Sequence, residues 1–300
     1  MQTSSTEQEI FELLERLNVW KRGDQRAPHK PLLVLYALAR SLRHEPRLIP
    51  FETVEKDLGR LLREFGPSRQ SHHPEYPFWW LQTDGLWEVQ SARPLKPRKG
   101  HTDPKKSELI EYQAVGGFPQ GIYDAFRGDS ELVREGARRL LCGHFPESLH
   151  GDILNAVGLP PLEGTGKIKP RDSEFRSTVI RAYQHRCAVC GFDIRLADSD
   201  LGVEAAHIRW HQSGGPDVVP NGLCLCVLHH RLFDRGAFGV STGRTILVSE
   251  EVHGSTGIEE WLFRFEGKPL NKPQRKDYQP AGEFVAWHLQ EVFRGPARTV

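Results

Sequence analysis

The stretch LCLCVLHHRLFD (residues 223–234) places two cysteines and two adjacent histidines within seven positions. Cys224, Cys226, His229 and His230 all belong to residue types that bind transition metals through sulfur or nitrogen. Adjacent residues of a helix point about 100° apart, so His229 and His230 are expected to face different surroundings. The stretch therefore predicts one metal site that ends at His229 and a separate task for His230.

A second cysteine pair completes a candidate zinc site. Cys187 and Cys190 form a C-x2-C knuckle, in which a tight turn aims both sulfurs at one ion. Cys226 and His229 supply a second pair with the same spacing, and the four together predict a tetrahedral structural zinc site. Cys224 is the alternative to Cys226 as the third cysteine ligand of this site. Because Cys224 closes no two-residue knuckle with a later ligand, we expect it to be a small buried side chain.

The composition is that of a globular protein rather than a membrane or disordered one. The 300 residues are 38% hydrophobic and 26% charged, with a net charge of +1. No apolar run approaches the roughly 18–20 residues that span a bilayer, and the acidic N-terminal stretch does not resemble a secretory signal. We therefore expect a cytoplasmic protein with no membrane partner and with reduced thiols, in which clustered cysteines bind metal.

Two domains are expected, in an α+β fold. The first, residues 1–162, is predicted to be mainly helical, because apolar residues recur with helical period in segments 7–20, 28–42, 51–65, 131–145 and 147–159. Within it, Asp84-Gly85 between two aromatic runs predicts a small β-hairpin over residues 76–89. A Pro-, Gly- and Lys-rich linker at 163–172 leads to the second domain, residues 173–300, with predicted helices at 173–183 and 282–293.

Three polar residues of the second domain follow one another in an order that resembles that of HNH nucleases, which hydrolyse phosphodiester bonds. His207 ends a predicted strand, Asn221 follows a glycine- and proline-rich loop, and His230 follows in the opening stretch. A neutral histidine can activate water at pH 7, and a divalent cation can neutralise the charge that develops on the phosphate. An asparagine can pin the loop that carries the base or offer an oxygen to the metal.

The pattern RCAVCG…VEAAHI…NGLCLC..HHRLFDRG resembles the HNH endonucleases of bacterial modification-dependent restriction, over about residues 187–240. The resemblance implies a ββα-metal fold beside a structural zinc, as in McrA-like type IV restriction enzymes. It implies that His207 is the general base, that Asn221 positions it, and that His230 binds Mg²⁺ or Mn²⁺. Many members carry an aspartate ligand just before the base, where this chain has Ala206.

The remaining ligands of the catalytic cation stay open. Glu204 shares the side of the predicted strand that Ala206 occupies. Asp234 lies one helical turn after His230. Either carboxylate can complete the metal site, and His211 is expected at the surface or beside it.

The first domain resembles the sulfur-binding domain of restriction enzymes that recognise phosphorothioated DNA. The resemblance is carried by WKRGDQRAPHKPLL (20–33), FGPSRQSHHPEYPFWWL (65–81), DGLWEV (84–89) and HFPESLHGDILNAVGL (144–159). It implies a sulfur pocket made of Tyr76 and Pro77 with Trp80 beside it, phosphate contacts from Arg26, His29 and Lys30, and phosphate or base contacts from Arg69, His72 and His73.

The physical chemistry of sulfur makes such a pocket sensible. A phosphorothioate sulfur is large and accepts hydrogen bonds poorly, so an apolar pocket accepts it, whereas an oxygen there would lose water without compensation. Basic runs at 20–30 and 93–106 add groups that can bind phosphate.

The chain is therefore expected to be a restriction endonuclease that acts on phosphorothioated double-stranded DNA. Two alternatives stay open: an HNH nuclease that reads a methylated base or plain DNA, and a zinc-containing DNA-binding protein without catalysis. One HNH site cuts one strand, so double-strand cleavage suggests a symmetric pair of chains.

Overall fold

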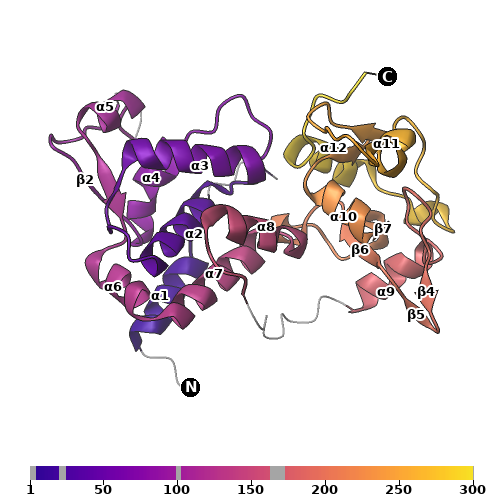
Figure 1. Ribbon diagram of the computed structural model, residues 1–300, viewed down its shortest axis with the longest axis horizontal. Coiled ribbons are helices and arrows are strands. Elements are labelled where there is room, and N and C mark those ends of the chain that lie inside the picture. The colour runs from indigo at the N-terminus through magenta and orange to yellow at the C-terminus, as the bar shows by residue number, and fades with distance from the viewer. Residues whose placement is uncertain (1–4, 20–24, 99–102, 163–172, 300) are drawn as a thin grey trace. The chain divides into compact units, whose positions relative to one another are not determined.

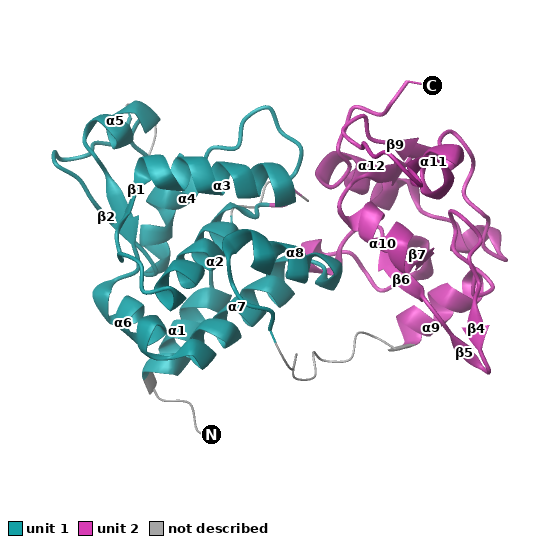
Figure 2. Ribbon diagram, in the orientation of Figure 1, with its two compact units in different colours: residues 1–22, 27–164 teal, residues 23–26, 165–300 magenta. Residues whose placement is uncertain are grey.

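The computed structural model describes residues 5–19, 25–98, 103–162 and 173–299. Contacts divide the chain into two units (Figure 2), of which the first comprises residues 1–22 and 27–164 and the second residues 23–26 and 165–300. The expected linker at 163–172 lies outside the described residues. Among the helices that are described, none is long and apolar enough to cross a membrane.

Helix α2 (His29–Leu42) forms the centre of the first unit. The side chains of four successive residues, Leu32 to Leu35, are fully buried, and a helix that is apolar on every side belongs inside a core. Around α2 lie the helices α3, α4, α6, α7 and α8 (Figure 1), and α1 packs against α7. Their bounds are Ser5–Glu15 for α1, Phe51–Phe65 for α3, Glu75–Trp80 for α4, Gln120–Gly128 for α6, Ser130–His144 for α7 and Glu147–Val157 for α8.

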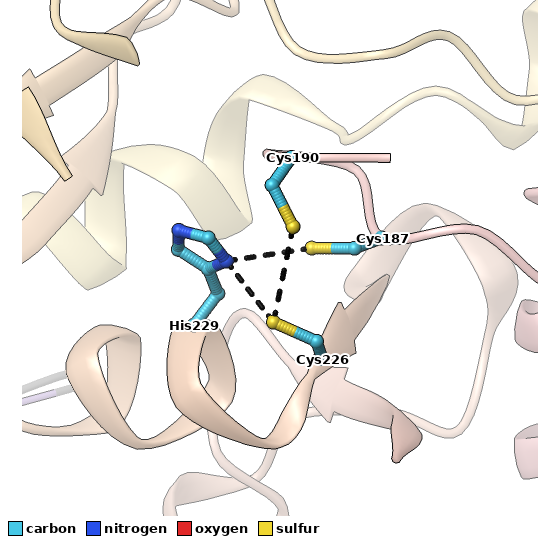
Figure 3. A group of neighbouring side chains, drawn as sticks. All are labelled: Cys187, Cys190, Cys226 and His229. Atoms are coloured by element: carbon cyan, nitrogen blue, oxygen red, sulfur yellow. Dashed lines mark hydrogen bonds between the residues drawn. The ribbon is translucent and has the colours of Figure 1, made fainter. Parts of the chain in front are cut away.

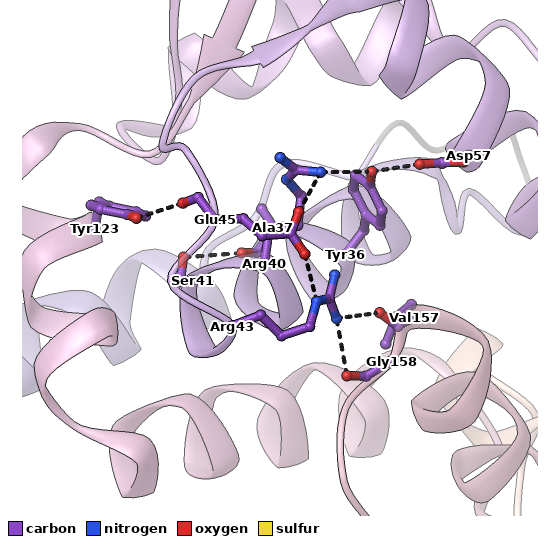
Figure 4. A network of polar contacts seen from close by, with 10 residues as sticks. All are labelled: Tyr36, Ala37, Arg40, Ser41, Arg43, Glu45, Asp57, Tyr123, Val157 and Gly158. Carbon is purple, nitrogen blue, oxygen red and sulfur yellow. Dashed lines mark hydrogen bonds and ion pairs between the residues drawn. The ribbon is translucent and has the colours of Figure 1, made fainter.

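Polar contacts tie the C-terminal half of α2 to its neighbours (Figure 4). The hydroxyl of Tyr36 donates to Asp57 of α3 at 2.6 Å. Burial, with the hydrogen bond to Asp57, raises the pKa of Tyr36 to about 12, so the phenol stays protonated. Arg43, which caps α2, donates to the carbonyl of Gly158 after α8 at 3.0 Å. These bonds hold α3 and α8 against the central helix.

Residues 76–89 do not form the predicted β-hairpin. Their first part forms α4 (Glu75–Trp80) and then the 3-10 helix η1 (Leu81–Asp84), and only Glu88 and Val89 belong to a strand. Pro77 fits the first turn of α4, where the missing N–H costs no helical hydrogen bond. Gly85, with φ 74°, takes the left-handed conformation as the cap of η1. The glycine that predicts a hairpin turn therefore ends a helix.

The first unit instead contains a three-stranded antiparallel sheet in the order β1-β3-β2. Its strands are β1 (Ile49–Pro50), β2 (Glu88–Gln90) and β3 (Val115–Gly117). The short helix α5 (Lys106–Glu111) precedes β3. The strands come from three separate segments of the chain, which explains why local sequence patterns do not predict the sheet.

Two antiparallel strands and a helix form the centre of the second unit. Strand β6 (Val203–His207) pairs with β7 (Gly222–Cys226), and His207 lies opposite Gly222. Helix α10 (Val227–Asp234) follows β7 directly. Helix α9 (Ser173–Ala182) packs against both strands. This ββα arrangement matches the expected α+β fold.

Shorter elements surround this centre. They are β4 (Arg195–Leu196) paired with β5 (Ser199–Asp200), β8 (Phe238–Val240) paired with β9 (Ile246–Val248), the helices α11 (Ile258–Trp261) and α12 (Gly282–Glu291), and the 3-10 helices η2 (His211–Ser213), η3 (Val219–Asn221), η4 (Phe263–Phe265) and η5 (Lys276–Tyr278).

Candidate functional site

Four side chains from two distant segments converge beside α10 (Figure 3). The ligand atoms of Cys187, Cys190, Cys226 and His229 all lie within 4.8 Å of one another. The sulfurs of Cys190 and Cys226 are 3.9 Å apart, and Nδ1 of His229 lies 3.7 Å from the sulfur of Cys187. Tetrahedral zinc with bonds of about 2.3 Å to sulfur separates two sulfurs by roughly 3.8 Å. The group therefore fits a zinc ion.

A hydrogen bond sets the orientation of the histidine in this group. Nε2 of His229 lies 2.9 Å from the carbonyl oxygen of Trp261. A carbonyl only accepts, so Nε2 carries the proton and the lone pair of His229 is on Nδ1, toward the sulfurs. Burial alone would lower the pKa of His229, but without a metal ion its hydrogen bonds to the sulfurs of Cys187 and Cys226, in which the protonated ring donates, raise the pKa to about 9. A zinc ion would take the Nδ1 lone pair in place of that proton.

Cys224 lies outside the metal-binding group. Its side chain is fully buried in the core of the second unit, and burial raises the pKa of its thiol to about 12. A thiol that stays protonated in an apolar core packs as a small hydrophobic side chain.

His230 turns to a different environment from that of His229. Its Nδ1 lies 2.6 Å from Glu204 of β6, and its Nε2 lies 3.2 Å from Asp234, one turn later on α10. Burial lowers the pKa of His230, but the carboxylates of Asp234 and Glu204 outweigh it and raise the pKa to about 10. The two carboxylates contact different nitrogens of the imidazole ring. When a cation binds one of these nitrogens, the carboxylate at the other nitrogen can still orient the ring.

The two carboxylates differ in their surroundings. The side chain of Asp234 is 2% exposed and accepts a hydrogen bond from the indole of Trp210 at 3.2 Å, whereas that of Glu204 is 46% exposed. Ala206, directly before His207 in β6, is fully buried. The structure thus brings both predicted carboxylates to His230.

Asn221 fixes the loop between β6 and β7 from inside. The residue is fully buried. Its amide oxygen accepts from the backbone N–H of Arg209 at 2.8 Å, and its amide nitrogen donates to the carbonyls of Arg209 and Pro216 at 3.0 and 2.9 Å. Asn221 therefore joins the two ends of the loop that follows His207, which is the pinning geometry rather than that of a metal ligand.

One residue beside His207, Asp217, belongs to no motif of the sequence. Nε2 of His207 lies 2.7 Å from Asp217, and the imidazole stacks on Phe175 of α9 with ring centroids 4.2 Å apart. Nδ1 of His211 lies 3.6 Å from the same Asp217 oxygen. The only signal for Asp217 is its place after two glycines and a proline in QSGGPD.

Predicted sulfur-binding residues gather around the start of α4. Tyr76 is 38% exposed, and its ring stacks on His73 with centroids 4.8 Å apart. His73 in turn contacts Glu75 at 2.9 Å. Arg98, from the basic run at 93–106, forms hydrogen bonds with Tyr76 and Asp103. An exposed aromatic ring is thereby bordered by cationic and imidazole groups.

His29 joins this group from the start of α2. Burial lowers the pKa of His29 to about 4, while a hydrogen bond to the backbone of His72 works in the opposite direction. The ring is therefore neutral at pH 7 and offers a hydrogen bond rather than a charge. Pro77 is buried and Trp80 half-buried beside Tyr76 in the same short helix, and Arg69 is exposed in the preceding loop.

Two predicted phosphate ligands already have partners. Nζ of Lys30 lies 2.5 Å from Asp84, and the Lys30 side chain is 11% exposed. The guanidinium of Arg26 donates to the carbonyl of Glu291 at 2.9 Å and lies 4.1 Å from the ring centroid of Trp210, all within the second unit. Both cationic groups are therefore engaged by protein atoms.

Each unit matches a family model. The ScoMcrA-like DNA sulfur-binding domain matches residues 7–162, and the HNH endonuclease model matches residues 187–241. Comparison with curated proteins gives no match.

Solved structures give matches of low overall similarity. The sulfur-binding domain of ScoMcrA complexed with phosphorothioated DNA is 25% identical, with a TM-score of 0.44 over 50% of this chain and 94% of that one. The sulfur-binding and SRA domains of ScoMcrA complexed with phosphorothioated DNA are 23% identical, with a TM-score of 0.47 over 66% and 68%. The type IV phosphorothioation-dependent restriction endonuclease ScoMcrA is 24% identical, with a TM-score of 0.42 over 51% and 35%.

The matches to family models assign both parts of the chain. The sulfur-binding model alone spans residues 7–162, just over half of the 300 residues. The chain therefore belongs to the family with a ScoMcrA-like DNA sulfur-binding domain, here joined to an HNH endonuclease domain.

Proposed function

We propose that this chain is a modification-dependent restriction endonuclease that binds phosphorothioated double-stranded DNA and hydrolyses phosphodiester bonds nearby. The observation that carries the proposal is the joining of a sulfur-binding domain to a ββα unit that retains His207, Asn221 and His230. Binding by the first unit brings DNA to the second, which supplies the chemistry. Because each chain carries one HNH motif, cleavage of both strands is proposed to use a symmetric pair of chains.

Recognition of sulfur is proposed to occur at Tyr76 and Pro77, with Trp80 alongside. The support is the partly exposed Tyr76 ring beside His73 and Arg98, which combines an apolar surface with groups that can bind flanking phosphates. His29, His72 and Arg69 are proposed to add further contacts. Lys30 and Arg26 are also proposed to bind DNA phosphates. To do so, each must first release the protein group that it contacts in this structure.

A duplex with one phosphorothioate is expected to bind more tightly than the same duplex with oxygen there. An uncompensated oxygen in an apolar pocket costs about 1–3 kcal/mol, or roughly 5- to 150-fold in Kd. Fluorescence anisotropy with the two duplexes measures the difference. Tyr76→Ala should reduce it, whereas the matched Tyr76→Phe keeps the ring and should retain it. Equal affinity of the natural protein for both duplexes would reject the sulfur pocket.

Hydrolysis is proposed to use His207 as general base. A proton moves from water to the imidazole, the resulting hydroxide attacks phosphorus, and the bond to the leaving oxygen breaks. Asn221 keeps the loop beside His207 in place. His230, with Glu204 or Asp234, would hold Mg²⁺ or Mn²⁺, which neutralises charge on the phosphate and leaving oxygen when bound. The Cys187, Cys190, Cys226 and His229 group would hold zinc in a purely structural role.

Removing either carboxylate at His230 is expected to weaken the response to the catalytic cation. Glu204→Gln and Asp234→Asn should each raise the Mn²⁺ concentration for half-maximal cleavage by at least about tenfold, because even a partner that only orients a ligand contributes that much. The variant with the larger increase in this Mn²⁺ concentration identifies the carboxylate that binds the cation. Cleavage rates across a Mn²⁺ series give the values, with exposed Asp198→Asn as the control. An unchanged Mn²⁺ dependence in both variants would show that the cation binds at another site.

A further inference from the structure

A second group of metal-binding side chains lies around His207, apart from the cysteine group. One ring nitrogen of His207, one ring nitrogen of His211 and a carboxylate oxygen of Asp217 all lie within 4.8 Å of one another. The separations are 2.7 Å between His207 and Asp217 and 3.6 Å between His211 and Asp217. His211 and Asp217 are both exposed, so an ion can reach them from solvent.

The loop that carries Asp217 is held firmly in this position. A Cβ on Gly215 would lie 1.9 Å from the carbonyl oxygen of Arg209, so only glycine permits the close approach of the two backbone segments. Asn221 then donates to the carbonyl of Pro216, the residue directly before Asp217. The asparagine of the HNH pattern therefore also holds the Asp217 carboxylate in position.

Asp217 determines which nitrogen of His207 carries the proton. An ionised carboxylate only accepts, so Nε2 of His207 must donate, and the lone pair of a neutral ring is then on Nδ1. Phe175 stacks on the ring and fixes its plane. Asp217 therefore keeps His207 in one tautomer, with Nδ1 as the nitrogen that accepts a proton from water.

We propose that His207, His211 and Asp217 form an inhibitory site for a borderline divalent ion such as Zn²⁺. Two imidazoles and one carboxylate are a donor set that suits such ions. Zinc ligands lie roughly 3.3 Å apart when bonds are about 2.0–2.1 Å, so His207 and Asp217 need to separate by only about half an ångström. The ion takes the lone pair of Nε2, and the ring proton moves to Nδ1. The tautomer that Asp217 maintains is thereby reversed, and His207 cannot act as a base.

The effect on cleavage rests on the proposed role of His207, whereas the binding of the ion does not. The test uses the full chain with its cysteine group already loaded with zinc. Equilibrium dialysis against added Zn²⁺ counts further bound ions, and cleavage of phosphorothioated plasmid at saturating Mg²⁺ measures inhibition. His211→Ala removes one ligand outside the proposed catalytic residues. The control His253→Ala removes an exposed histidine of the same unit.

His211→Ala is expected to bind one zinc equivalent fewer than the natural protein and to need at least about tenfold more Zn²⁺ for the same inhibition, since even changes beside a ligand cost that much in affinity. Its cleavage rate without added Zn²⁺ should be unchanged, and His253→Ala should match the natural protein in every measurement. Equal stoichiometry in the natural protein and His211→Ala would overturn the site. Equal zinc sensitivity of cleavage would overturn its inhibitory role. Absence of cleavage in every protein would reject the proposed function, and dialysis would still decide whether the ion binds.

Discussion

A His207→Ala protein is expected to bind phosphorothioated DNA as the natural protein does and to cleave it about 10²- to 10⁴-fold more slowly, the usual contribution of a general base. The imidazole lies between Phe175 and Asp217 at the end of β6. Its removal leaves the β6-β7 pairing, which runs through backbone hydrogen bonds. Anisotropy measures binding, and single-turnover cleavage of a labelled duplex measures the chemical step.

His253→Ala is the matched control for this experiment because it removes an exposed histidine from the same unit. It should leave both binding and cleavage unchanged. Near-normal cleavage by His207→Ala would exclude His207 as the base. Circular dichroism shows whether His207→Ala is folded. If it is not, His207→Gln replaces it, because glutamine keeps a hydrogen-bonding group toward Asp217.

Replacing Cys226 with alanine is expected to remove zinc and unfold the second unit. Structural zinc sites contribute about 10–16 kcal/mol of apparent binding free energy at pH 7, which is folding free energy. Cys226 joins β7 to α10, and His229 follows on that helix. Loss of the ion therefore releases the helix that also carries His230. Metal analysis and thermal unfolding followed by circular dichroism measure both effects.

Cys224→Ala is the matched control, since Cys224 lies two residues earlier in the same strand. It removes a buried sulfur from the core but no proposed ligand, so zinc content should be retained with a modest decrease in stability. The opposite result, with zinc lost from Cys224→Ala and kept by Cys226→Ala, would contradict the ligand set.

Residue spacing was informative where the function depends on neighbours in the chain. The C-x2-C knuckle and the pair Cys226 and His229 carry their own geometry, and the four donors do converge. The helical period of residues 51–65 likewise predicts α3 with the observed bounds. His229 and His230 diverge because adjacent positions on any helix must. Such features need no knowledge of distant contacts.

Contacts between distant segments were not predictable in the same way. Asp217 meets His207 only because Gly215 and Asn221 fold the intervening loop back. The positive charge of Lys30 suggests contact with phosphate when only the sequence is considered. In the structure, Lys30 forms an ion pair with Asp84 instead.

The aromatic segment 76–89 combined two signals that pointed in opposite directions. The Asp84-Gly85 pair is typical of a hairpin, while prolines at the start favour a helix, and the helix formed. Burial of Phe78 in the core of the first unit is compatible with either structure, so hydrophobicity did not decide between them.

The most direct test is digestion of a phosphorothioated plasmid and an unmodified plasmid side by side, with and without Mn²⁺. The proposed function predicts cleavage of the phosphorothioated plasmid alone, and only when the divalent cation is present. Equal cleavage of both plasmids would contradict recognition of sulfur, and no cleavage of either, despite binding to the phosphorothioated DNA, would contradict the nuclease.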